Sequence, residues 1–165
     1  MKYTDTLTTL FGHNLWANLR LLESCAALTE EQLNATSIGA FGSIRDILEH
    51  IVSAERSYFS RISTGQRYNA PEGAPPMTLA QMTESVRTTG AGFIEWLPKV
   101  QPQDTVTIDW DGTPRDVPKT YILTQVINHA TEHREQIKTI MTGLGIEPPD
   151  LQGWEYFDAV DSGRA

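Results

Sequence analysis

The segment QVINHATEHREQI (residues 125–137) carries two histidines, His129 and His133, four residues apart within a pattern of helical spacing. Positions four apart on a helix differ by about 40° around the axis and about 6 Å along it. Both imidazoles therefore share an apolar stripe with Val126 and Ile137. Buried imidazoles need polar partners, so the segment predicts a long helix with a polar cluster on its buried face.

Three further stretches have the apolar periodicity of long helices: residues 4–27, 43–62 and 78–97. Ser43 with Asp46, and Thr78 with Gln81, have the three-residue spacing of side-chain caps at helix N-termini. Thr29 predicts a further short helical turn in "TEEQL", and the last long helix is expected from Pro118 to the Gly143/Gly145 region. The tail after it is expected to be irregular and to pack through Trp154, Tyr156 and Phe157.

The period changes to two in TVTIDWDGTPRDV (residues 105–117), where Val106, Ile108 and Trp110 alternate with polar residues. Asp111-Gly112 is a strong signal for a two-residue hairpin turn. The chain is therefore predicted to be a single all-α domain over residues 1–165. An antiparallel four-helix bundle is the simplest packing, with a small β-hairpin inserted before the last helix.

Composition excludes several classes of partner. The formal net charge is −8 in 165 residues, and no run of Lys and Arg offsets it. Nucleic acids and anionic membrane surfaces are therefore not expected as partners. The single cysteine, Cys25, permits no internal disulfide and is expected to be a small core residue; a reducing, cytoplasmic location fits. No signal peptide or membrane-spanning run is recognised.

A third histidine, His50, lies on the apolar stripe of the second long helical segment, between Ile47 and Ala54. Three buried histidines allow two interpretations: each is hydrogen-bonded to neighbours, or one divalent cation binds all three. We favour the cation, held by His50, His129 and His133. His13 falls between apolar stripes and is expected to be solvated or near the mouth of the site.

Two other metal motifs fit less well. "HATEH" matches the H-x-x-E-H pattern of a metalloprotease, with Glu132 as the general base, but no suitable third ligand or peptide cleft is evident. A di-iron bundle needs Glu-x-x-His on two helices, whereas Ile47, Val126 and Ala130 precede the three histidines by three residues.

Four segments together resemble the DinB superfamily, which includes the YfiT-like proteins. They span nearly the whole chain: LWANLRLLESCAAL (15–28), GSIRDILEHIVSAERSYFSRI (42–62), ILTQVINHATEHREQI (122–137) and WEYFD (154–158). The resemblance implies a bundle in down-up-up-down order and a metal ion bound by His50, His129 and His133. Zinc, nickel or iron are the usual ions, and dimers are common. Active members include bacillithiol-dependent transferases and mycothiol-dependent maleylpyruvate isomerases; many members have no known reaction.

Three imidazoles leave a divalent ion at least one open position. Three functions stay open: transfer of a low-molecular-weight thiol to a small electrophile, hydrolysis by metal-bound water, or a structural ion. The site is expected to open near the loop 66–76 and the C-terminal aromatics. Gln125 or Asn128 are expected to support the ligands. Glu49 and Glu55 flank the site on the second long helical segment, and both a role there and solvation stay open. Apolar residues beside the first stripe (Leu15, Leu19 and Leu22) suggest a homodimer.

Overall fold

The computed structural model describes residues 5–165. It is mostly helical with one small antiparallel sheet, as the sequence predicts. The elements, in chain order, are α1 Thr6–Cys25, α2 Glu30–Leu33, α3 Ile44–Thr64, α4 Leu79–Trp96, a 3-10 turn η1 Leu97–Lys99, β1 Thr105–Trp110, β2 Thr113–Pro118, α5 Lys119–Gly143 and α6 Gly153–Asp161. The start of the first predicted helix, residue 4, lies outside the described residues.

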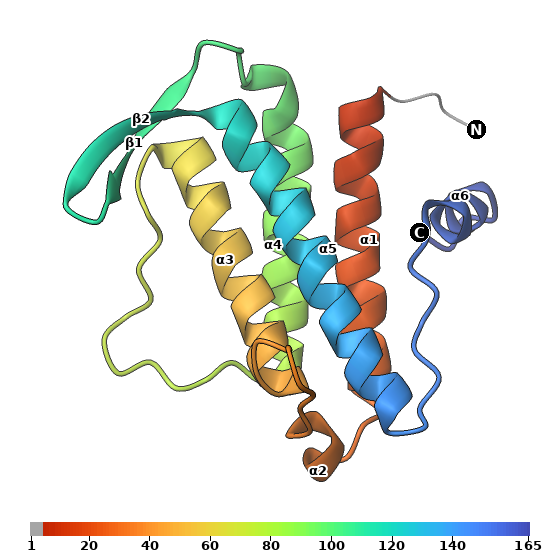
Figure 1. Ribbon diagram of the computed structural model, residues 1–165. Coiled ribbons are helices and arrows are strands. Elements are labelled where there is room, and N and C mark those ends of the chain that lie inside the picture. Colours follow the sequence, from red (N-terminus) through yellow and green to blue (C-terminus); the bar gives the residue numbers. More distant parts are fainter. Residues whose placement is uncertain (1–4) are drawn as a thin grey trace.

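The four long helices lie side by side (Figure 1). α1 contacts α4 and α5, and α3 contacts the same two helices on the other side. In the view of Figure 1, α1 and α5 run downward, whereas α3 and α4 run upward. The loop 66–77 descends along α3 to reach the start of α4, which leaves it beside the middle of α3. No helix among residues 5–165 is long and apolar enough to cross a membrane.

The predicted helix caps are present. Thr29, Ser43 and Thr78 each form a reciprocal capping box, and Gly65 ends α3 in the left-handed conformation with φ 76°. The predicted hairpin is also present, with Asp111 at φ 53° and Gly112 at φ 81°. Positive φ at both turn residues matches the right-handed twist of the flanking strands.

The prediction of an irregular tail is wrong, because residues 153–161 form α6 against α1 (Figure 1). Tyr156 packs on Trp16 and His13, whereas Trp154 and Phe157 are 80% and 46% exposed. His13 is not solvated, since its Nε2–H donates to the carbonyl of Leu151 at 2.7 Å. α6 lacks a side-chain N-cap, so the local signal that marks the starts of α1, α2, α3 and α4 is missing.

A buried polar network joins all four long helices. It includes Glu55, so solvation, one of the two alternatives left open for this residue, is excluded. Glu55 of α3 is 3% exposed and accepts hydrogen bonds from Asn14 and Asn18 of α1 (3.4 and 2.9 Å) and Thr89 of α4 (2.5 Å). Arg134 of α5 donates to the amide oxygens of the same two asparagines, at 2.8 Å each. The two asparagines thus connect the carboxylate to the guanidinium.

The surroundings act on both charged groups of this network. Burial raises the pKa of Glu55, and the bond from Thr89 and the charge of Arg134 lower it. Burial lowers the pKa of Arg134 to about 10, so its guanidinium is still charged at neutral pH. Every polar atom of the network has a partner, as buried polar groups require. Cys25 is buried in the apolar core as predicted, and burial raises the pKa of its thiol to about 12.

Two glycines in α4 let the neighbouring helices approach closely. A Cβ at Gly90 would lie 2.6 Å from Leu15 of α1, and a Cβ at Gly92 would lie 2.4 Å from the ring of Phe59 on α3. Glycine is a poor helix former, so its cost here is offset by packing. The contact with Gly90 also covers part of Leu15, which the sequence places beside the main apolar stripe of the first helix.

We expect Gly92→Ala to lower the free energy of unfolding by about 1–3 kcal/mol, because the added methyl group displaces the Phe59 ring. Helix propensity alone predicts a gain of about 1 kcal/mol for the same change. Gly143→Ala is the matched control, since nothing lies within 4 Å of its added Cβ. Urea unfolding measures both variants. Equal or higher stability of Gly92→Ala would show that the contact with Phe59 does not constrain α4.

Candidate metal centre

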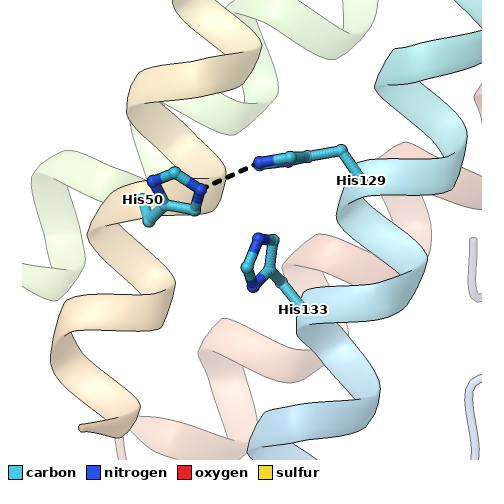
Figure 2. Close-up of side chains that lie close together, drawn as sticks. All are labelled: His50, His129 and His133. Atoms are coloured by element: carbon cyan, nitrogen blue, oxygen red, sulfur yellow. Dashed lines mark hydrogen bonds between the residues drawn. The ribbon is translucent and has the colours of Figure 1, made fainter. Parts of the chain in front are cut away.

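The three predicted histidines come together where α3 and α5 pack against each other (Figure 2). His50 lies on α3, and His129 and His133 lie one turn apart on α5. The Nε2 atoms of His50 and His129 are 2.9 Å apart, and one ligand atom from each of the three residues lies within 4.8 Å of the others. Figure 2 shows ring nitrogens of all three pointing toward the space between the helices.

Two of the three histidines, His50 and His129, are held as neutral imidazoles. Burial lowers the pKa of His129 to about 4, helped by His133 and then His50. Burial, followed by His133, also lowers the pKa of His50. His133 is 9% exposed, and its ring meets His129 and His50 edge to face. Neutral imidazole is the form of histidine that binds a metal ion.

Gln136 and Phe41 support the cluster, and sequence reasoning missed both. The side-chain oxygen of Gln136 accepts from His133 Nδ1 and from the backbone N–H of Phe41, each at 3.1 Å. This bond places the proton on Nδ1 and leaves Nε2 of His133 as the ligand atom. Phe41 stacks on His50, with ring centroids 4.1 Å apart. The spacing of Gln136 three residues after His133 was the available signal.

The residues expected to assist the ligands lie elsewhere. Gln125 faces the hairpin, where it lines a groove with Trp110. Asn128 donates to Glu132 at 3.1 Å on the exposed side of α5, so both residues lie on the surface. Glu49 accepts the backbone N–H of Met77 at 3.3 Å.

The donor set fits a divalent ion such as zinc. Two imidazole nitrogens bound to one tetrahedral zinc lie about 3.4 Å apart, which is within the spread of the three nitrogens. Among residues 5–165, the cluster of possible ligands contains only these three histidines. Three imidazole ligands with no fourth protein ligand in this described part of the chain are typical of an open metal site rather than a closed structural one.

A model of the DinB family matches residues 1–161. The chain belongs to the DinB family. It is also similar to the structure of a DinB-like protein from Bacillus cereus ATCC 10987, with a TM-score of 0.59 and 21% sequence identity. The alignment covers 84% of this chain and 90% of that one. At this identity the likeness shows the fold alone. Comparison with curated proteins finds no match.

Two grooves of this DinB protein meet beside the histidines. One, of about 820 Å³, lies between α3 and the loop 66–77 and reaches His50. The other, of about 770 Å³, lies between the hairpin and α5. Tyr58 and Arg61 line both grooves, and the Tyr58 ring meets His129 edge to face at 5.9 Å. The predicted opening near the loop is present, but the C-terminal aromatics lie against α1 and not at the site.

We expect alanine at His50, His129 or His133 to remove most of the bound metal, measured by elemental analysis of the purified variants. Each substitution deletes one of three ligands. Gln136→Ala should keep the metal but weaken its affinity roughly 10–100-fold, because it frees the ring of His133.

His13→Ala is the control, because His13 contacts the α6 region and not the cluster. Full metal occupancy in all three histidine variants would contradict the assignment.

Proposed function

We propose that this chain is a single-domain, metal-dependent DinB protein, built as a down-up-up-down four-helix bundle, that transfers a low-molecular-weight thiol to a small electrophile. His50, His129 and His133 would hold one divalent ion, with zinc, nickel or iron as candidates. The observation that carries the proposal is the set of three imidazoles, with no fourth ligand among residues 5–165, next to two grooves. A bound divalent ion would lower the pKa of a coordinated thiol and so supply a thiolate at neutral pH.

The two grooves support a reaction of two substrates. Tyr58 and Arg61 stand where the grooves meet and would orient one reactant toward the other. Trp110 and Tyr121 give the hairpin groove large apolar rings suited to an electrophile. The chain itself offers no nucleophilic thiol, since Cys25 is buried and its pKa is raised to about 12. An external thiol is therefore required.

The reaction balances without an oxidant. With 1-chloro-2,4-dinitrobenzene as the electrophile, the thiol sulfur forms a bond to the ring carbon that carries chlorine. The carbon–chlorine bond breaks, chloride leaves with the bonding pair, and the thiol proton passes to the solvent. A reducing, cytoplasmic location would keep such a thiol available and belongs to the same proposal.

Hydrolysis by metal-bound water is the second candidate, because an open position accepts water as readily as a thiol. A purely structural ion is less well supported, since two of the three histidines are half-buried and one lines an open groove. The transferase is favoured over the hydrolase because two separate grooves end at the same residues.

We expect a cobalt-substituted sample to develop a near-ultraviolet charge-transfer band when a small thiol is added, because thiolate sulfur would become a ligand. The zinc-loaded protein should also accelerate transfer of that thiol to 1-chloro-2,4-dinitrobenzene, and His133→Ala should abolish the acceleration. Absorbance spectroscopy measures both effects.

An unchanged cobalt spectrum in excess thiol would exclude the transferase. If ester hydrolysis by the same sample then depended on His133, the hydrolase would replace it. A crystal structure with a fourth protein ligand would instead identify a structural ion.

We also propose that the protein is a homodimer. Leu15, Leu19 and Leu22 no longer support this, because Leu22 is buried and the other two pack partly against the core. An exposed apolar row on α1 replaces them: Leu7 and Leu10 are 39% and 43% exposed and border an apolar groove with α5.

Light scattering at micromolar concentration should give twice the 18.4 kDa chain mass. Leu10→Lys should shift the protein toward the monomer, because it places a charge in the apolar row. Leu144→Lys, at an exposed leucine beyond α5, is the control. A monomeric wild-type protein would refute the dimer.

A further inference from the structure

The groove between α3 and the loop 66–77 is basic, although the chain as a whole carries a net charge of −8. Arg56 and Arg61 of α3 and Arg67 of the loop line it, and Glu49 is the only carboxylate among its lining residues. The three arginines are separated by other residue types along the chain, so no basic run announces them in the sequence. Folding of the loop beside α3 brings them together.

None of these guanidinium groups pairs with a carboxylate. The salt bridges of residues 5–165 involve Arg20, Arg45, Lys99 and Lys138 as the cations. Arg56 instead donates to the hydroxyl of Tyr68 and lies over its ring at 4.0 Å. Arg61 donates to the hydroxyl of Ser57 at 2.5 Å. Each group keeps donors that a planar anion could use, because a guanidinium has five N–H bonds.

Arg61 and Arg67 also repel each other. Partial burial and then the charge of Arg67 lower the pKa of Arg61. Like charges held together in a groove cost free energy unless an anion neutralises them. The fold nevertheless fixes Arg56 through Tyr68, and Arg56 also donates to the sulfur of Met77 at 3.6 Å. A set of cations held in place without an acidic partner is a preformed receptor for an anion.

We propose that this groove binds a small molecule carrying a carboxylate or phosphate group, and that the bound anion extends toward His50. Arginine recognises both groups by paired hydrogen bonds, which a lysine cannot match. A volume of about 820 Å³ suits a small metabolite. If the proposed function holds, this molecule is one of the two reactants; anion binding itself does not depend on that function.

Amide NMR titration of the metal-free protein tests anion binding without any contribution from the ion. Succinate and inorganic phosphate are the two probes, and sodium chloride at equal ionic strength is the blank. Saturable shifts are expected for residues 66–77 and for the neighbouring turns of α3. The tighter of the two probes identifies the anionic group that the site prefers.

Arg61→Gln and Arg67→Gln should each weaken the preferred probe roughly 10-fold, the value of one charge-assisted hydrogen bond. Arg67 is exposed, so its variant tests the site even if replacement of the half-buried Arg61 disturbs folding. Arg87→Gln is the matched control. It makes the same change in net charge at an exposed arginine of α4 that lines a different groove.

Two results would overturn the proposal: shifts no larger than those in chloride, or an equal loss of affinity in Arg87→Gln and Arg67→Gln. The second result would mean that the loss of anion affinity comes from the change in the protein's net charge and not from a specific site.

A kinetic comparison then connects the groove to the reaction. The metal-loaded protein is assayed with one thiol and two electrophiles, neutral 1-chloro-2,4-dinitrobenzene and its anionic relative 4-chloro-3,5-dinitrobenzoate. If the electrophile is the anionic reactant, Arg67→Gln should raise KM for the benzoate alone. If the thiol is instead the anionic reactant, Arg67→Gln should raise the KM for a carboxylate-bearing thiol such as thiomalate. It should leave the KM for 2-mercaptoethanol unchanged. If Arg67→Gln changes the KM of none of these electrophiles and thiols while the wild-type protein still binds anions, the groove has no part in the reaction. No turnover at all would refute the proposed function and leave the anion site in place.

Discussion

The fold depends on satisfying two buried charges, those of Glu55 and Arg134, at a single level of the four long helices. Asn14 and Asn18 bridge the two groups, and the hydroxyl of Thr89 donates a further hydrogen bond to the carboxylate. Each long helix therefore contributes a side chain to one network. Removing either charged partner would leave the other unpaired in the interior, which costs several kcal/mol in buried pairs of this kind. A shift of one helix along another would break several of these bonds at once. The network therefore opposes sliding of the helices, which apolar contacts alone oppose weakly.

The same register sets the geometry of the candidate metal site. Arg134 follows His133 directly on α5, and Glu55 lies little more than one turn after His50 on α3. When Arg134 reaches the asparagines of α1, His133 is turned toward α3 and meets His50. The interior network and the half-exposed histidine cluster are thus two sides of the same pair of helices. This arrangement lets a stable interior position ligands that remain accessible from a groove.

Much of this structure could be predicted from local sequence. The capping boxes at Ser43 and Thr78, the Asp111-Gly112 turn and the helical spacing of His129 and His133 each depend on residues a few positions apart. What could not be predicted depends on distant residues. Glu55 reads as a surface residue until Asn18 and Thr89 are placed beside it, and Gln136 gains its role from Phe41, on a loop 95 residues away. The arginine groove exists only after the loop 66–77 has folded along α3.

The glycines of α4 have an effect beyond the contacts that they make. The loop 66–77 joins the end of α3 to the start of α4, so the helices that anchor its two ends pack against each other. Gly92 sets how closely these helices pack through Phe59, and neither residue lines the arginine groove. Substitutions on α4 could therefore widen or narrow the arginine groove without touching any molecule bound in it. Relatives with the same three histidines could therefore differ in the shape of the neighbouring groove through the closeness of one helix contact alone.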